Sequence, residues 1–350
     1  MPRQVPATRR QLTLLIAAAA IAAAVVVAAL LPVPYVILSP GPTLNTLGTQ
    51  SGKPLITISG HRTYPTNGHL NMVTVSYQGG PSDGFNLFTA LQAWLSPHEA
   101  VVPESELFGT NLTQQQVTRE DTQQMVGSQQ LAQAAALCQL GIPYTVLDSV
   151  AQVGPGTPVA GVLKTGDIIT AVGGKKLTCR ADAGTLIRAR KPGAPVRLTV
   201  DRHGATRRFL VKTTDDGKGN AVVGVGVNET YKFPFQVKIN IGNIGGPSAG
   251  LMFALGIMDK LTPGGLTGGR FIAGTGEIAA NGAVAPIGGI QQKMAGARAA
   301  GATVFLTPAA NCPDTAGAVP QGMRLIKVST LAGAVSALKA LRAGGNVPSC

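Results

Sequence analysis

The fold of the C-terminal part of this chain is decided by the stretch Gly245-Gly246-Pro247-Ser248-Ala249-Gly250-Leu251, which runs on into apolar residues to about Leu261. Apolar residues at alternate positions lead into this stretch: Phe235, Val237, Ile239 and Ile241. The pattern predicts a strand, a glycine-rich loop and a helix, and proline suits the first turn of that helix. Ser248 would then lie at a helix N-terminus, where unpaired backbone N–H groups and the positive end of the helix dipole can stabilise an oxyanion. A serine in this place is also an ordinary N-cap.

A second glycine-rich region contains Gly274-Thr275-Gly276-Glu277-Ile278, then Pro286-Ile287-Gly288-Gly289-Ile290, and it ends in a predicted helix from Gln291 to about Ala300. Lys293 has small or apolar neighbours in this helix, so the helix can pack closely and keep the amine dry; a solvated lysine is the ordinary alternative. All four histidines precede Ser248, and none lies in a motif typical of a hydrolase triad. A lysine can replace histidine as the base when burial lowers its pKa from ~10.4 to about 7–8.

Three motifs in this order resemble the proteolytic domain of the Lon family. Gly246 to Gly250 match its Gly-Pro-Ser-Ala-Gly motif, Thr275 to Ile278 match its Thr-Gly-Glu-Ile element, and Pro286 to Gly289 match the Pro-Ile-Gly-Gly segment before the catalytic lysine. The resemblance covers roughly residues 220–345, including a predicted strand at 303–306, a strand at 324–328 and a helix at 331–341.

The resemblance implies a role for each matched residue. Ser248 would be the nucleophile, Lys293 the general base and Thr275 a group that orients the lysine. Gly246 and Ala249 would support the nucleophile, with an oxyanion hole formed by N–H groups around Ser248 and Ala249. Two departures matter: Lon enzymes carry an acidic residue shortly before the nucleophile loop, whereas residues 238–246 contain none, and no Gly-x-x-x-x-Gly-Lys-Ser/Thr motif for ATP occurs.

The segment Val159 to Gly174 contains Leu163-Lys164-Thr165-Gly166-Asp167-Ile168-Ile169 and resembles the PDZ family. Predicted short strands at 144–150, 167–172, 195–201 and 206–213, with one helix near 181–190, agree with that resemblance. PDZ domains bind an extended peptide at an open sheet edge, so a peptide-binding module is implied. Leu140, Gly141 and Ile142 could form its carboxylate-binding loop, or they could equally end a helix predicted from about Arg119 to Leu140, with Gly141 as its C-cap.

The N-terminal run Leu12 to Leu31 has Thr13 as its only polar member, and its length spans a ~30 Å hydrocarbon core. Three arginines precede the run (Arg3, Arg9 and Arg10), and the next basic residue is Lys53. By the positive-inside rule we expect a single-pass anchor in the cell membrane, with the N-terminus cytosolic and the catalytic domain extracytoplasmic. A cleaved signal peptide is the alternative, and it would export the same domains.

The formal charge of +13 is scattered along the chain and is not interleaved with aromatic residues, which make up 4% of the sequence. This pattern argues against nucleic acid as a partner. The four cysteines show no C-x-x-C spacing, so we expect no metal and no cofactor. Disulfides between Cys138 and Cys179 and between Cys312 and Cys350 are one of three possible connectivities, and free thiols are the other possibility.

We therefore predict an α+β protein with an N-terminal transmembrane helix, a PDZ-like β-rich domain and a Lon-type proteolytic domain. A helix near 118–137 resembles one that Lon domains place upstream of the nucleophile, which would make the PDZ-like domain an insertion that splits the protease domain. The expected boundaries are a cytosolic N-terminus (1–11), the anchor (12–31), a linker around Ser39-Pro40-Gly41-Pro42 (32–43), the N-terminal part of the Lon-like domain (44–141), the PDZ-like domain (142–214) and the proteolytic domain with the catalytic dyad (216–350).

The combination of anchor, PDZ-like domain and Lon-type domain resembles the membrane-anchored PDZ proteases of bacteria called YlbL-like. It implies an ATP-independent serine endopeptidase that cleaves unfolded or flexible envelope polypeptides, with the PDZ module recruiting substrate. Two alternatives stay open: a catalytically inactive PDZ adaptor that tethers exported proteins, and a protein that releases itself from the membrane by self-cleavage. A homo-oligomeric ring is expected by analogy with Lon alone.

Overall fold

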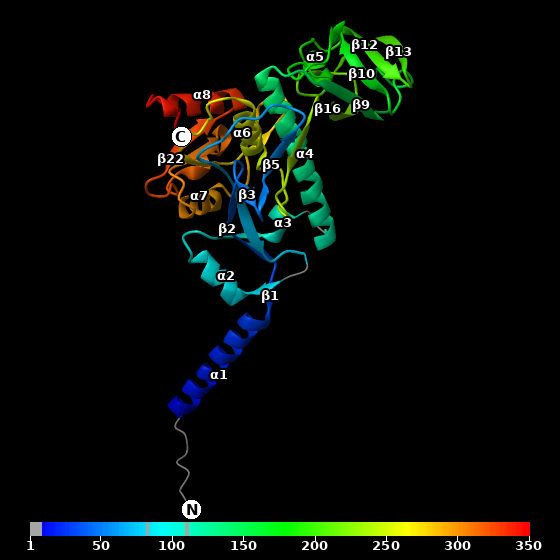
Figure 1. The fold of residues 1–350 in the computed structure, drawn as a ribbon. Coiled ribbons are helices and arrows are strands. Elements are labelled where there is room, and N and C mark those ends of the chain that lie inside the picture. The colour runs from blue at the N-terminus through cyan, green and yellow to red at the C-terminus, as the bar shows by residue number, and fades with distance from the viewer. Residues whose placement is uncertain (1–8, 82–83, 109–111) are drawn as a thin grey trace, which may run out of the picture.

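The structure is a computed structural model that describes residues 9–81, 84–108 and 112–350. Helix α1 (Arg9–Leu30) projects from the rest of the molecule as a separate rod (Figure 1). Its stretch Gln11–Leu30 is long and apolar enough to cross a membrane, and 0% of it is buried. The predicted anchor is therefore an exposed apolar helix, which is compatible with membrane anchoring. Most of the predicted tail 1–11, Arg3 included, lies outside the described residues.

A mixed sheet in the order β22-β21-β18-β6-β2-β8 forms the centre of the larger domain. Its strands are β2 (Tyr35–Asn45), β6 (His69–Gln78), β8 (Ala100–Pro103), β18 (Phe271–Gly274), β21 (Val304–Pro308) and β22 (Arg324–Val328). Strands β6, β18, β21 and β22 are parallel, whereas β2 and β8 are antiparallel to their neighbours. Because β6 pairs directly with β18, segments from both ends of the chain build one sheet.

Helices cover both faces of this sheet. Helices α4 (Gln114–Leu140), α6 (Gly250–Leu261) and α8 (Leu331–Arg342) pack on one face, and α7 (Ile290–Ala299) packs on the other. Alternate residues of each strand face opposite layers: Leu70 and Met72 join the core with α4, α6 and α8, whereas Val73 joins the core with α7. The two helices that follow the protease motifs, α6 and α7, therefore lie on opposite faces of the central sheet.

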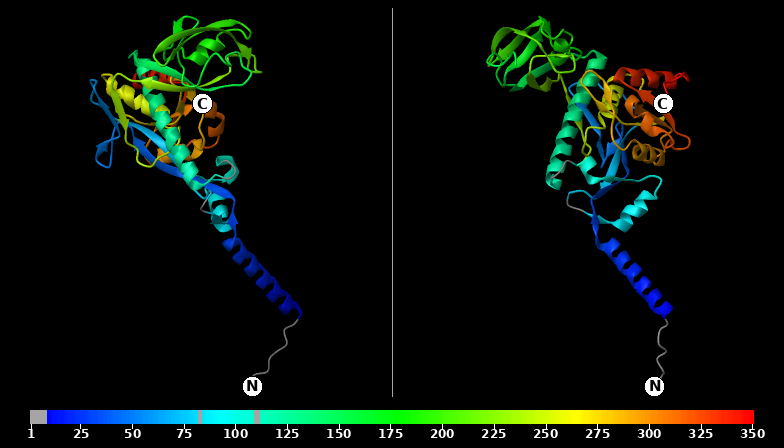
Figure 2. Two further views of the ribbon diagram at one scale, coloured as in Figure 1. Left: turned by 90° about the vertical axis from the view of Figure 1, so that its right-hand side faces the viewer. Right: turned by 180° about the vertical axis from the view of Figure 1, so that it is seen from behind.

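Helix α4 is defined by sequence signals at both of its ends. Thr113 and Gln116 form a reciprocal capping box at its start, and Gly141 ends it in a left-handed conformation with φ of 71°. The helix starts several residues before the predicted Arg119, because the capping box lies upstream of the apolar pattern. In Figure 2 it runs along the side of the larger domain toward the smaller one.

The predicted linker at 32–43 is wrong, because Ser39-Pro40-Gly41-Pro42 lies inside β2. Strand β8 pairs with β2 only from Tyr35 to Leu38, so the two prolines lie where one side of β2 is an open edge. The register with β6 also shifts between Pro40 and Thr43. A Cβ on Gly41 would lie 2.9 Å from the backbone carbonyl carbon of Thr74, so a glycine is needed for the two strands to approach. Strand β2 can therefore contain these prolines and this glycine because one side of the strand is unpaired there and its register with β6 is irregular.

The smaller domain is a sheet in the order β13-β12-β10-β9-β16, with β11 on β10. Its elements are β9 (Thr145–Val153), β10 (Ile168–Val172), β11 (Lys175–Lys176), α5 (Ala183–Arg188), β12 (Pro195–Arg202), β13 (Ala205–Lys212) and β16 (Val225–Lys232). It has its own core, which includes Leu163, Ile169 and Leu198. Strand β16 pairs with β9 along its whole length, so this sheet extends beyond the boundary predicted at residue 214.

Short elements and two disulfides complete the chain. The short elements are β1 (Pro32–Val33), β3 (Thr49–Gln50), β4 (Lys53–Pro54), β5 (Ile56–Ser59), β7 (Phe85–Asn86), α2 (Leu87–Trp94), α3 (Glu104–Leu107), β14 (Thr214–Asp215), β15 (Ala221–Val222), β17 (Gln236–Ile239), β19 (Glu277–Ile278), β20 (Val284–Ala285), η1 (Ala309–Asn311) and η2 (Pro313–Thr315). Cys138 pairs with Cys179 and Cys312 pairs with Cys350. The first bond joins the end of α4 to the smaller domain, and the second ties down the C-terminus.

Excision of residues 145–232 tests whether the smaller domain is an insertion. We expect a chain in which Tyr144 is joined to Phe233 by a short Gly-Ser linker, with Cys138→Ser, to melt cooperatively, because Thr145 and Lys232 are paired neighbours and the two cores are separate. The measurement is a melting curve of the detergent-solubilised protein by circular dichroism. Deletion of 142–214 is the matched control, and we expect it to be less stable because it removes β9 and leaves β16 unpaired. Aggregation of the 145–232 deletion with every linker length would contradict the insertion.

Candidate active site

The loop that carries Ser248 is held on one side by α4. The N–H of Gly246 donates to the backbone carbonyl of Asp121 at 3.0 Å, and the Ser128 hydroxyl donates to the carbonyl of Pro247 at 2.9 Å. A Cβ on Gly245 would lie 2.5 Å from the Cβ of Asp121, so only glycine allows the loop to approach the helix this closely. Helix α4 therefore fixes the loop backbone in place before the chain enters α6.

The segment 274–278 holds the same loop from the opposite side. The carbonyl of Ser248 accepts two hydrogen bonds, from the N–H of Gly276 at 2.8 Å and from the hydroxyl of Thr275 at 3.0 Å. The N–H of Leu251 in turn donates to the carbonyl of Gly276. Thr275 is completely buried and its hydroxyl positions the backbone of Ser248. The resemblance implied a contact with the lysine, so in this structure the role of Thr275 differs from the expected one.

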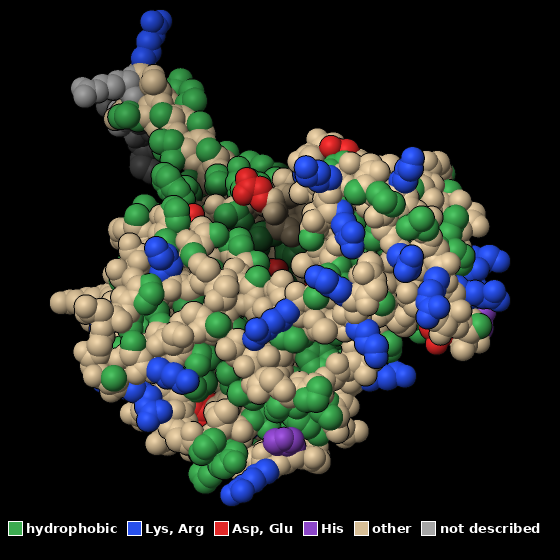
Figure 3. All heavy atoms as spheres, turned by 90° about the horizontal axis from the view of Figure 1, so that it is seen from above, with side chains coloured by type: hydrophobic (Ala, Val, Ile, Leu, Met, Phe, Trp, Pro, Cys, Tyr) green, Lys and Arg blue, Asp and Glu red, His purple; other side chains and the backbone are tan. Residues whose placement is uncertain are grey.

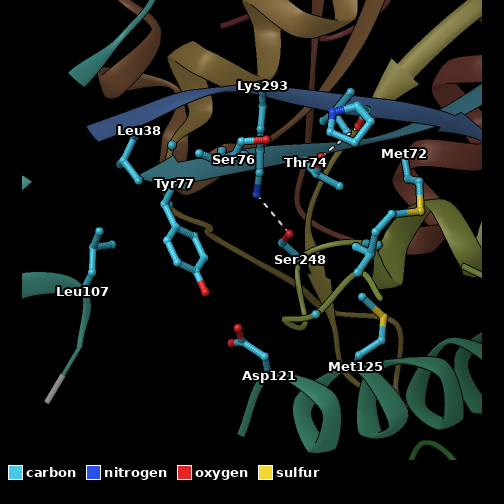
Figure 4. Close-up of a pocket in the computed structure, with 18 of the residues that line it drawn as sticks. Leu38, Met72, Thr74, Ser76, Tyr77, Leu107, Asp121, Met125, Ser248 and Lys293 are labelled. Carbon is cyan, nitrogen blue, oxygen red and sulfur yellow. Dashed lines mark hydrogen bonds between the residues drawn. The ribbon is translucent and has the colours of Figure 1, made fainter. Parts of the chain in front are cut away.

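Lys293 lies on α7, which packs on the opposite face of the sheet from α6. Its Nζ donates to the Oγ of Ser248 at 3.0 Å, and Figure 4 shows the two side chains pointing toward each other. The lysine side chain is 4% exposed. Burial lowers its pKa to about 8, and the charge of Glu277 opposes that shift. The structure thus brings together the two residues that lay in separate motifs of the sequence, in a setting that makes the amine easier to deprotonate.

Close packing of α7 on β2 brings Lys293 to this depth. A Cβ on Gly296 would lie 3.3 Å from the carbonyl oxygen of Gly41 and 3.4 Å from the Cβ of Pro40. The helix therefore rests almost directly on the backbone of β2, at the segment that the sequence predicted to be a linker. A side chain at 296 would fit only if α7 or the β2 backbone gave way by a few tenths of an ångström, so the glycine favours the close approach that brings Lys293 to Ser248.

The backbone around Ser248 offers donors for an oxyanion. Ala249 is the N-cap of α6, and no acceptor within the described part of the chain is found for the N–H groups of Ser248 and Ala249. Gly246 is different, because its N–H is already bonded to Asp121; its φ of 84° is a left-handed conformation that shapes the loop. Gly246 thus supports the turn, while the two following residues present free donors at a helix N-terminus.

These groups line a cleft of about 480 Å³ between α4, β6 and the nucleophile loop. Its walls include Met72, Tyr77, Leu107 and Met125, so they are largely apolar. Asp121 is an acidic side chain in the lining, and Figure 4 shows it on α4, beneath Tyr77 and beside the nucleophile. Burial and the charge of Glu120 raise its pKa. Residues 238–246 lack an acid, but the fold places one next to the loop from a distant helix.

Sequence reasoning missed Asp121 and Ser128 as functional residues. Both lie in a stretch that was predicted only as a helix, and both contact the nucleophile loop through long-range hydrogen bonds. Apolar spacing predicts which face of a helix is buried, but no local pattern in the sequence predicts which loop that face will contact. The resemblance of this helix to one upstream of Lon nucleophiles was the only signal available.

The expected carboxylate loop at Leu140, Gly141 and Ile142 is wrong, and the helix-end interpretation is correct. The N–H groups of Gly141 and Ile142 donate to carbonyls of the last turn of α4, so they are not available to a ligand. Strand β9, which follows, is paired on both sides. The edge strands of this sheet are β13 and β16, and a groove of about 530 Å³ lies between the N-terminal part of β16 and α5, lined by residues that include Ile187, Arg188 and Val225.

The burial of Lys293 predicts a stability change for Lys293→Met. The pKa of Lys293 is about 8 in the folded state, against an ordinary value of 10.5. Keeping the buried lysine charged therefore lowers the free energy of unfolding by roughly 3 kcal/mol. This cost is fully present below pH 8 and disappears as the pH rises toward 10.5. We expect the variant to melt at a higher temperature than the parent at pH 7, with the difference shrinking toward pH 10.5. Lys339→Met, at an exposed position of α8, is the control. A variant that is less stable at pH 7 would contradict the prediction.

Comparisons with known proteins match two parts of the chain. The family model of the PDZ domain matches residues 138–213, and that of the Lon protease (S16) C-terminal proteolytic domain matches residues 233–339. The PDZ domain of the SdrC-like protein from Listeria monocytogenes is a similar solved structure, with 26% sequence identity, coverage of 23% of this chain and 85% of that chain, and a TM-score of 0.22.

Curated relatives of the chain are Lon proteases. Lon protease 1 of Bacillus subtilis is 30% identical over 176 residues, which cover 48% of this chain and 21% of that protein. Lon protease 2 of Thermus thermophilus is 36% identical over 110 residues (31% and 13%), and Lon protease of Roseiflexus castenholzii is 42% identical over 69 residues (20% and 8%). The chain thus spans about a fifth or less of the length of these relatives. With mixed helix and strand content as predicted, it combines a PDZ domain with a Lon-type C-terminal proteolytic domain, which supports a serine peptidase related to the Lon proteases.

Proposed function

We propose that this chain is a membrane-anchored serine endopeptidase that uses Ser248 and Lys293 as a catalytic dyad and works without ATP. The observation that carries the proposal is the hydrogen bond of 3.0 Å between Lys293 Nζ and Ser248 Oγ in an open, largely apolar cleft. The absence of a phosphate-binding motif from the sequence favours substrates that are already unfolded or flexible. The cleft would accept such a segment in extended form.

The mechanism follows from the geometry. Neutral Lys293 accepts the hydroxyl proton of Ser248 while Oγ attacks the scissile carbonyl carbon, and the resulting oxyanion accepts hydrogen bonds from the free N–H groups of Ser248 and Ala249. The lysine then gives the proton to the departing amine, which leaves an acyl-enzyme. In the second half, Lys293 takes a proton from water while the water oxygen attacks the ester carbon; the bond between that carbon and Oγ then breaks, and Lys293 returns the proton to Oγ, which regenerates Ser248 and releases the acid. Thr275 acts as a positioning residue, since it holds the carbonyl of Ser248 and thus the direction of its side chain.

We place the catalytic domain on the extracytoplasmic side of the membrane. Arg3, Arg9 and Arg10 precede the apolar run that begins at Leu12, and the next basic residue is Lys53, which favours a cytosolic N-terminus. The two disulfides support an oxidising compartment for the domains that follow the helix. Basic side chains are spread over the surface seen in Figure 3, while apolar side chains cover the projecting helix. This distribution supports lipid and polypeptide as partners, in preference to nucleic acid.

The PDZ domain would recruit substrate at the open edge of β16. An extended peptide can add there as a further strand and place side chains into the neighbouring groove toward α5, where Ile187 supplies an apolar wall and Arg188 a cation. The Cys138–Cys179 disulfide fastens this domain to the end of α4, the helix that also holds the nucleophile loop. A bound tail would thereby be kept near the cleft.

Three proteins test the dyad: the parent chain, Ser248→Ala and Lys293→Ala, each in detergent with a fluorogenic peptide or unfolded protein substrate. We expect both variants to lose turnover by about a thousandfold or more, since the nucleophile and its base act as one unit. A serine-reactive probe should label the parent at Ser248 and leave Ser248→Ala unlabelled. Equal turnover by all three proteins would contradict the dyad.

The same three proteins distinguish the protease from the two alternatives, an inactive adaptor and a protein that releases itself from the membrane. An inactive adaptor would give no labelling and no turnover in the parent chain. Self-release would appear in the intact mass of membrane-extracted protein as a truncated chain in the parent and a full-length chain in Ser248→Ala.

The pH dependence of the rate tests the protonation state of Lys293. Because the base must be neutral, kcat/KM should rise with pH with a midpoint near 8. The negative charge of Glu277 raises the lysine pKa, so Glu277→Gln should move that midpoint to a lower pH. Glu229→Gln, which changes an acid that does not shift Lys293, is the matched control and should leave the midpoint unchanged. A midpoint that stays fixed or rises in Glu277→Gln would exclude Lys293 as the titrating base.

A further inference from the structure

Helix α2 lies directly beside the end of the anchor helix. Strand β1 follows α1 and pairs with β7, with Pro32 opposite Asn86 and Val33 opposite Phe85, and α2 begins at the next residue, Leu87. Helices α1 and α2 are also in contact. Figures 1 and 2 show α2 at the anchor end of the molecule and the PDZ domain at the opposite end. Residues that begin α2 are therefore held at the level where the anchor ends.

The outward face of α2 is apolar. Two small residues, Ala90 and Ala93, face inward and pack with Ile37 and Phe85. The large apolar side chains are exposed: Leu87 40%, Phe88 52%, Leu91 48%, Trp94 70% and Leu95 79%. At 100° per residue these five positions form one continuous stripe on the side away from the alanines. A helix at the surface of a soluble domain normally carries polar residues on this face, so α2 has the reverse pattern.

We infer that α2 is an interfacial helix whose apolar face rests in the outer surface of the lipid bilayer beside the anchor. The inference rests on the proposed membrane anchoring, because α2 contacts the helix that would form the anchor. Trp94 fits this place, since tryptophan is enriched at the boundary between headgroups and acyl chains. The segment 84–108 contains acidic residues and no Lys or Arg, so binding is driven by apolar burial and does not need anionic lipid.

This placement also narrows the substrate class. Helix α2 packs against β8, and α3 follows β8 and ends in Leu107, which lines the catalytic cleft together with Phe108. With α2 seated in the bilayer surface, this end of the cleft is held close to the membrane. The polypeptides within reach are then the membrane-proximal segments of other anchored proteins, which need not leave the membrane to be cleaved.

Trp94 is the single tryptophan of the chain, so its fluorescence reports on α2 alone. The full chain is reconstituted into phosphatidylcholine liposomes, and flotation with resistance to alkaline extraction establishes the anchor. We expect the Trp94 emission to be blue-shifted and to be quenched by phosphatidylcholine brominated near the headgroup end of the acyl chains, with little quenching by aqueous iodide. The quenching should be unaffected by salt, because no basic residue takes part.

Two further proteins serve as controls. The double variant Leu91→Gln/Leu95→Gln should float like the parent. Because two large apolar side chains are removed from the stripe, we expect the fraction of Trp94 that bromolipid quenches to fall by about tenfold or more. Gln92→Ser, on the same helix outside the stripe, should behave like the parent. In a Trp94→Phe background, Leu210→Trp places the reporter on the exposed edge of the PDZ domain, where bromolipid should not quench it.

The outcomes separate this inference from the proposed anchoring. If the chain floats but Trp94 is quenched by iodide and not by bromolipid, the anchor stands and the interfacial helix is excluded. Blue-shifted emission without lipid quenching, together with fluorescence transfer between labelled copies, would show a second copy of the chain on α2 and would also overturn the inference. A chain that does not float overturns the anchoring, and the inference with it.

Discussion

The candidate active site depends on one constraint: the loop 245–250 is held between two elements that come from opposite sides of the PDZ domain in the sequence. Helix α4 binds it through Asp121 and Ser128, and the segment after β18 binds it through Thr275 and Gly276. A loop with this many glycines would be flexible on its own, because glycine restricts the backbone least. Clamped on both sides, it presents Ser248 in one orientation and keeps the neighbouring N–H groups free.

The second half of the site follows from packing across the sheet. Lys293 reaches Ser248 because Gly296 lets α7 settle on β2, and β2 can carry Pro40 and Pro42 because β8 has ended by then. The result is a buried amine whose charged form is disfavoured. The same burial that prepares the lysine to accept a proton weakens the fold at neutral pH, and the extensive core shared by α4, α6 and α8 offsets that cost.

The arrangement of the domains bears on the proposed membrane anchoring. Helix α1, the proposed anchor, and α2 lie at one end, and the PDZ domain lies at the other, fastened to α4 by a disulfide. Helix α4 runs between the PDZ domain and the nucleophile loop, so one rigid element contacts both. A polypeptide that is tethered in the bilayer at one end and held by its tail at the other would pass across the cleft between them.

The sequence by itself determined the features that depend on local patterns: the apolar length of α1, the PDZ-like strands and the motif residues Ser248 and Lys293. It offered Gly141 as a helix end or as part of a loop, and the structure decided for the helix end. Only the tertiary structure decided what depends on contacts between distant segments. It placed Pro40 in a strand, added β16 to the PDZ sheet, directed Thr275 to the backbone of Ser248 and supplied Asp121 to the cleft. The physical reason is that spacing and propensity report on a residue's own helix or strand, whereas pairing and hydrogen bonding across the fold leave no periodic signal in the chain.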